Sequence, residues 1–330
     1  MIVVTGSIAF DYLMVFPGRF KEHILSDRIE HVSLSFLVDE MKVVRGGCAA
    51  NIAYSLALLG ERPYLMATIG CDGAEYRDWL AAQGVDVSGL RLCPDCFTAS
   101  FFVNTDLDGN QIATFYSGAM SRARELSFYD LPNPRGVEWA IISPNDPQAM
   151  RRYTQECREL SIPFIYDPSQ QVARVGGEEL LESARGARIL IVNEYEYELF
   201  RKKAGLDEAG LLALVETLIV TRGKEGSLII TREAGRRVTH EIPAAPAAQR
   251  LDPTGVGDAY RAGLLKGLRA GLPWPITGRL ASLAAVYVLE HEGPQPAPYT
   301  REEFVARYER TFGPEEAVRR ALLAPARAEG

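Results

Sequence analysis

Residues 252–258, DPTGVGD, place two acids and two glycines at the start of an apolar helical pattern. Gly255 and Gly257 flank Val256 and let the backbone approach an anion closely, with its N–H groups at the positive end of a helix. Asp258 follows directly, where a carboxylate would repel a bound phosphate unless it had a task. That task is to accept the proton of a hydroxyl as a phosphoryl group moves onto it. The loop therefore predicts phosphoryl transfer; the alternative is a glycine-rich turn in which Asp258 caps a helix.

A second helix that opens with glycines lies early in the chain, at residues 45–60, RGGCAANIAYSLALLG. Its apolar residues recur at helical spacing and face a core. Gly46 and Gly47 precede the helix and permit a ligand to come close. Asn51, in the first turn, offers both a donor and an acceptor. Taken alone, the segment is better explained as an ordinary amphipathic helix that opens with glycines.

The elements that must position these motifs alternate along the chain between short β-branched runs and helical patterns. Several runs are continuously apolar, which is typical of a parallel sheet covered on both faces. Alternation of this kind predicts a doubly wound, three-layer α/β sheet. The expected strands are Ile2–Val4, Tyr64–Ile69, Trp139–Ser143, Pro163–Asp167, Ile189–Asn193, Leu218–Thr221 and Ser227–Thr231, and the expected helices are Cys48–Leu59, Ala74–Gln83, Asp146–Leu160, Gly177–Ala184 and Ile276–Glu290.

Two segments, about 10–44 and 98–116, break the alternation. The first is largely strand-like, with no strong helix signal. The second predicts two strands joined at Asp108-Gly109-Asn110, a good hairpin signal. Both leave the sheet at the ends of strands, where α/β proteins bind ligands. We expect them to form a small β-sheet lid over the site, within a single domain of residues 1–330; a β-insertion without function is the alternative.

Composition excludes several classes of protein. The 330 residues carry a formal net charge of −7, which argues against a broadly basic nucleic-acid face. No apolar run is long enough to span a membrane, and the N-terminus does not match a signal peptide, so the cytoplasm is the expected location. The five cysteines are odd in number and scattered, which argues against a disulfide framework. Cys93 and Cys96 form a lone C-x-x-C without the further ligands that zinc requires.

The two glycine motifs, in this order, resemble the paired signatures of the ribokinase-like kinases, also called the PfkB carbohydrate kinases. The resemblance covers essentially the whole chain. A third element fits: residues 193–196, NEYE, match an N-x-x-E pattern that helps to organise magnesium and nucleotide phosphates in that family. The resemblance assigns Glu196 to the magnesium shell. A P-loop kinase is excluded because the G-x-x-x-x-G-K-[ST] pattern is absent.

Within that family the chain most resembles bacterial adenosine kinases of the mycobacterial type, through stretches such as VTGSIAFDYLMVFPGRF, IATFYSGAMSRAR, DPSQQVAR and DPTGVGDAYRAG. The resemblance implies transfer of a phosphoryl group from ATP to the 5′-hydroxyl of adenosine, in purine salvage. A carboxylate suits a vicinal diol, and two phenyl rings suit a flat base. The residues implied for the nucleoside are Ser7, Asp11, Gly46, Gly47, Asn51, Phe101, Phe115, Gln170, Gln171 and Arg174.

On the ATP side the resemblance implies small residues at 281, 282, 284 and 285 as a slot for adenine. Relatives commonly hold a monovalent cation such as potassium beside the anion loop, and Asp252 and Thr254 offer oxygens for it. The residues implied near the ATP phosphates and ribose are Asn193, Thr221, Gly223 and Gly226.

Together these features predict that Asp258 is the general base and that the amides of residues 255–257 receive the charge that develops on the phosphoryl oxygens. A ribose or other sugar kinase is the alternative within the family. A catalytically silent nucleotide-binding regulator is the alternative from a different class. Lid strands have exposed edges, which tend to find partners, so a homodimer through the lid is a further expectation.

Overall fold

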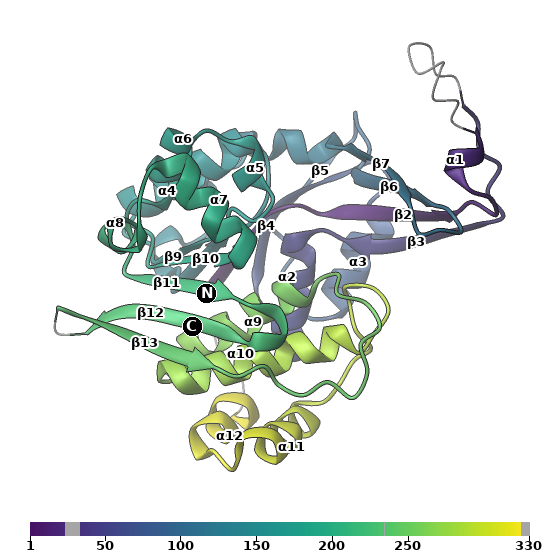
Figure 1. The fold of residues 1–330 in the computed structure, drawn as a ribbon. Coiled ribbons are helices and arrows are strands. Elements are labelled where there is room, and N and C mark those ends of the chain that lie inside the picture. Colours follow the sequence, from purple (N-terminus) through teal and green to yellow (C-terminus); the bar gives the residue numbers. More distant parts are fainter. Residues whose placement is uncertain (24–33, 234, 325–330) are drawn as a thin grey trace.

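The computed structural model describes residues 1–23, 34–233 and 235–324. Nine strands form the central sheet in the order β13-β12-β11-β10-β9-β8-β1-β4-β5 (Figure 1). The strands from β5 to β11 run parallel, and β12 and β13 add an antiparallel edge. The strands are β1 (Ile2–Thr5), β4 (Tyr64–Gly70), β5 (Leu90–Cys93), β8 (Trp139–Ile142), β9 (Phe164–Tyr166), β10 (Ile189–Asn193), β11 (Thr217–Thr221), β12 (Ser227–Glu233) and β13 (Arg236–Ile242).

Helices cover both faces of this sheet because successive strand residues point to opposite sides. Val3, Ala140 and Leu190 belong to the core on one face, beneath α4 (Pro147–Glu159), α5 (Gln171–Arg174), α6 (Gly177–Ala184), α7 (Glu194–Ala204) and α8 (Glu208–Leu214). Ile2 and Ile191 belong to the core on the other face, beneath α2 (Cys48–Leu58), α3 (Ala74–Ala82), α9 (Val256–Arg269) and α10 (Trp274–Leu289). The doubly wound, three-layer architecture is therefore confirmed.

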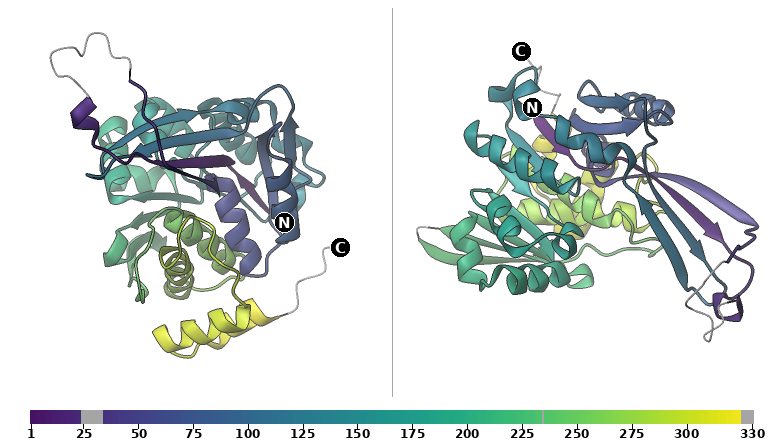
Figure 2. Two further views of the ribbon diagram at one scale, coloured as in Figure 1. Left: turned by 90° about the vertical axis from the view of Figure 1, so that its right-hand side faces the viewer. Right: turned by 90° about the horizontal axis from the view of Figure 1, so that it is seen from above.

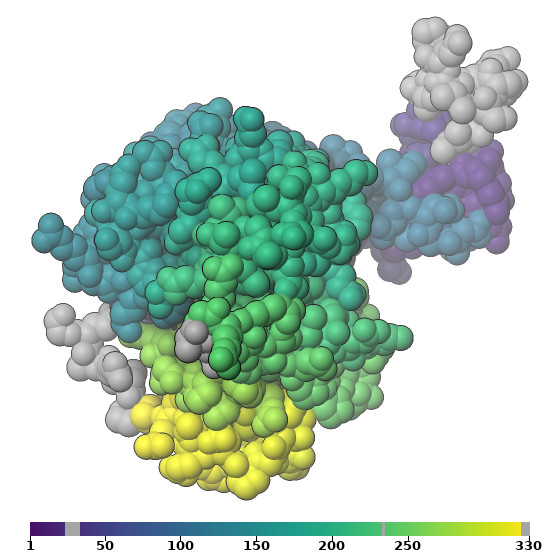
Figure 3. All heavy atoms as spheres, turned by 60° about the vertical axis from the view of Figure 1, so that its left-hand side comes forward, coloured from purple at the N-terminus to yellow at the C-terminus, as the bar shows by residue number. Residues whose placement is uncertain are grey.

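A second sheet of four strands, in the order β3-β2-β6-β7, forms the lid. It stands out from the body in Figure 2 and Figure 3, away from α11 (Arg301–Phe312) and α12 (Glu316–Leu323), which pack on α10. Asp106 accepts hydrogen bonds from the amides of Asp108 and Asn110, and Gly109 has φ 80°, so the expected hairpin turn forms. The lid strands are β2 (Ala9–Val15), β3 (Glu40–Gly46), β6 (Ala99–Thr105) and β7 (Gln111–Tyr116).

The structure differs from the sequence expectations in a few elements. A short helix, α1 (Phe20–His23), lies in the segment expected to have no helix, and residues 24–33 of that segment lie outside the described residues. Strands β5 and β13 were missed, because each lies at an edge of the sheet and several of its residues are exposed. All five cysteines are free, as expected. Within the described ranges, no helix has the length and apolar character needed to cross a membrane.

Candidate active site

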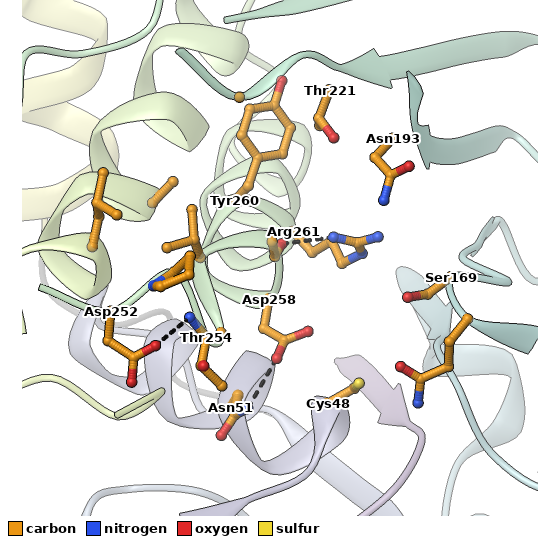
Figure 4. A pocket seen from close by; sticks show the side chains of 18 of the residues that line it. Cys48, Asn51, Ser169, Asn193, Thr221, Asp252, Thr254, Asp258, Tyr260 and Arg261 are labelled. Carbon is orange, nitrogen blue, oxygen red and sulfur yellow. Dashed lines mark hydrogen bonds between the residues drawn. The ribbon is translucent and has the colours of Figure 1, made fainter. Parts of the chain in front are cut away.

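A cavity of about 1090 Å³ opens between the lid, the carboxyl ends of the parallel strands and the start of α9. Ligands of open α/β sheets bind outside the carboxyl ends of the strands, and this cavity lies there. Figure 4 shows polar side chains that point into it from α2, α9 and the ends of β10 and β11. The residues that the sequence assigned to a site line this cavity, with the exception of Gly46 and of the residues at 281 and 284.

Asp258 lies in the first turn of α9 and faces α2 across the cavity floor (Figure 4). Asn51 donates a hydrogen bond from Nδ2 to Asp258 Oδ2 at 2.9 Å. Burial raises the pKa of Asp258 above its ordinary value, while Arg261 and hydrogen bonds from Asn51 and Cys48 oppose that rise. The carboxylate is thus fixed by one oxygen and suited to accept a proton at the other.

The Asn51 amide is itself held by residues that the sequence did not indicate. Gln295 donates from Nε2 to Asn51 Oδ1 at 3.2 Å and to the Tyr76 hydroxyl at 2.5 Å. Tyr76 in turn donates to the carbonyl of Gly46 at 3.0 Å. This chain of bonds leads from Asp258 to the point where the lid strand β3 meets the start of α2. It fixes the orientation of the amide, so that Nδ2 faces Asp258.

The glycine loop before α9 is shaped by two close approaches. Gly255 has φ 78°, and a Cβ there would lie 2.5 Å from the Cβ of Pro294. A Cβ at Gly257 would lie 2.8 Å from Nη1 of Arg261. The Val256 amide donates to the Pro253 carbonyl at 3.3 Å. The amides of residues 255, 257 and 258 have no acceptor in the part of the chain that the structure describes, as expected for the first turn of a helix.

The lid contributes one row of side chains to the cavity. Asp11 on β2 is directly opposite Phe101 on β6, which is directly opposite Phe115 on β7. Residues directly opposite each other share a face of the sheet. Burial and then the charge of Asp252 raise the pKa of Asp11 to about 6. A carboxylate and two phenyl rings are therefore side by side over the same cavity.

The turn between β3 and α2 supports that row. Gly46 does not line the cavity. A Cβ at this position would lie 2.8 Å from Asp11 Oδ2, so the lack of a side chain at Gly46 leaves space for the Asp11 carboxylate. Gly47 has φ 96°, and a Cβ would lie 2.6 Å from the backbone of Ile8. Ser7 lines the cavity and its Oγ accepts a hydrogen bond from the Cys48 amide at the start of α2. Ser7 thus has a local structural task at a helix start.

Three further predicted residues line the cavity in and just before α5, after the end of β9. Gln171 is buried and donates from Nε2 to the carbonyl of Asn145 at 2.8 Å. Gln170 and Arg174 are exposed and reach the cavity from the same turn. Of these three, only Gln171 is fixed by a hydrogen bond that the described residues provide.

The N-x-x-E pattern forms a capping box at the start of α7. Asn193 Oδ1 accepts from the Glu196 amide, and Glu196 Oε2 accepts from the Asn193 amide, each at 2.8 Å. Both side chains line the cavity. The pattern therefore has a structural role in this chain, and it leaves the second carboxylate oxygen of Glu196 outside the box.

The cavity is also lined by the end of β11 and the turn that leads into β12. Thr221 is the last residue of β11, and Gly223 and Gly226 lie in that turn. A Cβ at Gly226 would lie 1.9 Å from the Ile242 carbonyl, so close packing of β13 requires this glycine. Of the small residues expected to form an adenine slot on α10, those at 282 and 285 line the cavity. Those at 281 and 284 are buried in hydrophobic cores and do not line it.

Asp252 and Thr254 lie where the loop meets the segment after α10. Asp252 accepts from the Thr254 amide at 2.8 Å and from the Gly293 amide at 3.0 Å. Burial acts to raise the pKa of Asp252, but the hydrogen bonds from Thr254 and Gly293 hold it below its ordinary value. Among the described residues, no group of three or more His, Cys, Asp or Glu side chains is arranged to hold a metal ion.

Comparisons with known proteins agree with this geometry. The family model described as pfkB family carbohydrate kinase matches residues 5–301. This chain belongs to the pfkB family. The ribokinase-like fold expected from the sequence is confirmed, since the structure of ribokinase from Thermotoga maritima has a TM-score of 0.75 at 20% identity, over 94% of this chain and 99% of that one.

More similar members of the pfkB family are named as nucleoside kinases. That of Methanothermobacter thermautotrophicus is 31% identical over 322 residues, which cover 96% of this chain and 98% of that protein. The structure of Burkholderia thailandensis nucleoside kinase in complex with inosine is 40% identical with a TM-score of 0.83, over 96% of this chain and 99% of that one. A further structure of the Burkholderia protein is a complex with ADP-inosine.

Several lining residues of this pfkB chain were missed in the sequence. Arg261 follows the motif by three positions, inside the quoted stretch DPTGVGDAYRAG, and was passed over as part of an apolar helix. The other lining residues were not assigned a role; a few of them lie inside the motifs, and folding brings the rest to the site. They are Ala9, Cys48, Met120, Pro144, Ser169, Lys224, Ala244, Ala245, Ala247, Arg250, Leu251, Pro253, Tyr260, Val286 and Leu289.

Proposed function

We propose that this chain transfers the γ-phosphoryl group of ATP to the 5′-hydroxyl of a purine nucleoside, and that its preferred nucleoside is adenosine. The observation that carries the proposal is the row of Asp11, Phe101 and Phe115 on the lid, over the cavity that also contains Asp258. A carboxylate can accept from both hydroxyls of a ribose, and aromatic rings stack on a base. The nucleoside kinases among its relatives support the same class of substrate.

In this mechanism the chain supplies a base and an anion hole. Asp258 removes the proton of the 5′-hydroxyl as the phosphoryl group arrives, while Asn51 keeps the carboxylate in place. The unpaired amides of residues 255, 257 and 258, at the positive end of α9, stabilise the charge on the transferring group. The lid then excludes water, so that hydrolysis of ATP does not compete.

Glu196 and Asn193 fit the expected magnesium site. The Glu196 side chain is buried at the cavity wall, and the capping box uses one of its two oxygens. Magnesium is bound through one or two carboxylates together with phosphates and water, so this donor set is sufficient. When bound, the ion neutralises charge on the phosphate oxygens. Asp252 and Thr254 retain oxygens for a potassium ion beside the loop, which we propose as an activator.

The test is a substrate screen with ATP and magnesium, with and without potassium. Adenosine, inosine, guanosine, cytidine, ribose and fructose 6-phosphate are compared by kcat/KM. Stacking of the base predicts that adenosine exceeds ribose by at least about fivefold. A higher kcat/KM for ribose or fructose 6-phosphate than for every nucleoside would contradict the proposal of a nucleoside kinase. A higher kcat/KM for inosine than for adenosine would change the preferred nucleoside from adenosine to inosine. No turnover of any acceptor would favour the silent regulator.

We also propose that two chains pair through their lids. The outer face of the lid, opposite the cavity, carries Tyr12, Met41, Val43, Phe102 and Ile112, which are all on the same side by strand register. Met41 is 61% exposed and Val43 is 49% exposed. An apolar sheet face with two open edges is a surface that partners tend to cover.

A further inference from the structure

Arg261 is a buried cation beside the candidate base, and nothing in the proposed mechanism uses it. It lies on α9, one turn after Gly257, and only 7% of it is exposed. Its Nη2 donates to Asp167 Oδ1 at 2.6 Å, and its Nε lies 2.5 Å from Asp167 Oδ2. Its Nη1 donates to the carbonyl of Gly257 at 2.8 Å, the bond drawn in Figure 4. One guanidinium thus connects the end of β9 to the anion loop.

The partner of Arg261 in this connection is as deeply buried as the cation. Asp167 is 1% exposed and follows β9, where its amide donates to the carbonyl of Ile142. Either charge without the other would be costly in this position. Arg261 donates one hydrogen bond to Asp167, from Nη2 to Oδ1, while Nε and Oδ2 are in ion-pair contact without a hydrogen bond of their own. Its Nη1 still donates to the Gly257 carbonyl, and a lysine ammonium has no planar fork to contact both partners in this way.

The sequence of the loop is adapted to this arginine. A Cβ at Gly257 would lie 2.8 Å from Nη1, so a larger residue there would displace the guanidinium from its present position. In a trans peptide the C=O and N–H groups point in opposite directions. A hydrogen bond that holds the Gly257 carbonyl on one side therefore aims the amide of Asp258 to the other. That amide is one of those with no acceptor among the described residues.

We propose that Arg261, anchored by Asp167, is a positioning residue for phosphoryl transfer, which fixes the peptide between Gly257 and Asp258 and thereby aims the Asp258 amide and side chain. This inference rests on the proposed kinase function and is independent of which acceptor is used. The positive charge of Arg261 also opposes the rise that burial causes in the pKa of Asp258. The other groups that face Asp258 are Cys48 and Asn51 on α2 and the Asp167 carboxylate.

The decisive variant replaces the ion pair by two neutral amides, Arg261→Gln with Asp167→Asn, so that no unpaired charge remains buried. We expect a folded protein whose kcat is reduced by about 10²-fold, the usual effect of a small misplacement at a reacting centre. The dissociation constant for the nucleoside, measured by calorimetry without ATP, should change by less than about threefold, because the lid row is untouched. Arg261→Lys should have an intermediate kcat.

The matched control is Arg269→Gln, at the other end of the same helix, where Arg269 pairs with Glu61 and Glu138. It should lower the melting temperature without a comparable loss of kcat. Guanidinium at low millimolar concentration should restore part of the kcat of Arg261→Ala, and ammonium should not. A double variant that keeps kcat within about threefold of the wild type, far from the loss expected of misplacement, overturns the proposal. Wild-type protein that phosphorylates no acceptor would instead overturn the proposed function, and this inference with it.

Discussion

At the scale of single residues, the site depends on carboxylates whose ionisation is set by their surroundings. Burial raises the pKa of Asp258 and of Asp11, whereas hydrogen bonds from two backbone amides lower the pKa of Asp252. Perturbed groups that share one cavity are typical of a functional site. The two raised groups have different tasks in the proposed mechanism, so they give separate predictions.

The first prediction concerns Asp258→Asn, which keeps the size of the side chain and its place beside Asn51 but removes the base. We expect kcat to fall by about 10²–10⁴-fold, the usual contribution of a general base. The dissociation constant for adenosine should be close to that of the wild type, because the base acts mainly in the transition state. Single-turnover kinetics and calorimetry measure the two quantities. A kcat above about a third of the wild-type value would leave Asp258 only the role of a helix cap.

The second prediction concerns the pH dependence that Asp11 imposes. Its pKa of about 6 means that the carboxylate becomes protonated as the pH falls through that value. A protonated carboxyl accepts less well from two hydroxyls, so the KM for adenosine should rise between about pH 7 and pH 5. In Asp11→Asn the KM should be higher and nearly constant over this range. The potassium concentration is kept fixed in this measurement. Burial and then the charge of Asp252, which is a proposed potassium ligand, raise the pKa of Asp11.

The same shift predicts the sign of a stability effect. The folded pKa of Asp11 is above its ordinary value of 3.8, so the ionised carboxylate opposes folding above about pH 6. This cost disappears as the pH falls toward the ordinary value. Asp11→Asn should therefore melt at a higher temperature than the wild type at pH 7.5, with a difference that shrinks toward pH 4. A variant that is less stable at both pH values would contradict a buried, destabilising charge.

At the scale of elements, the sequence predicted most of what periodicity and turn chemistry determine. Strand Ile189–Asn193 and helix Gly177–Ala184 agree at both ends, and the hairpin at Gly109 forms as expected. The edge strand β13 was missed because pairing with β12 makes it a strand, and its own sequence, RRVTHEI, is largely polar. A local sequence pattern does not predict strand pairing of this kind, because it depends on contacts between distant segments of the chain.

The candidate site shows the same division. Asp258, Asn51, Gly47, Gly255 and Gly257 belong to motifs with a chemical reason for each residue type, and they line the cavity. Gln295 and Tyr76 have no such motif. Gln295 bonds Asn51 from 244 positions away along the chain, and Tyr76 accepts from Gln295 rather than bonding Asn51 itself. Only the fold brings these side chains together. Single-sequence reasoning therefore finds the proposed reacting groups better than the groups that orient them.

The third prediction belongs to the lid hairpin. Phe101→Ala or Phe115→Ala should raise the KM for adenosine about 5- to 150-fold, the range that corresponds to 1–3 kcal/mol of stacking on a base. The KM for ATP should change little, because the predicted ATP residues lie on the opposite wall. Leu107→Ala is the matched control, since Leu107 lies in the turn of the same hairpin, is 60% exposed, and belongs neither to the cavity lining nor to the residues named on the outer face. Equal KM values in all three variants, with lowered melting temperatures, would show that the rings only pack the lid.

At the scale of the whole molecule, one body carries the proposed base, the proposed anion loop and the residues proposed to bind ATP, while a separate small sheet carries the row proposed to bind the nucleoside. The lid stands out from the body in Figure 2, and its outer face has no cover among the described residues. Asp11, on the lid, is close enough to Asp252, on the body, for their charges to interact. Stabilising the lid in one position should therefore matter for nucleoside binding.

The last prediction tests whether a second chain stabilises the lid. We expect light scattering to give twice the 36.4 kDa mass of one chain, because apolar sheet faces of this kind associate. Met41→Lys with Val43→Lys places two charges on the outer face and should yield monomers. The control is Leu323→Lys, an exposed apolar residue on α12 at the opposite end of the molecule, which should remain a dimer. Met41 and Val43 do not line the cavity. A monomeric double variant with a raised KM for adenosine and an unchanged KM for ATP would therefore show that pairing of two chains affects the position of the lid. A wild-type protein that is monomeric at micromolar concentration would contradict the pairing and leave the lid to act alone.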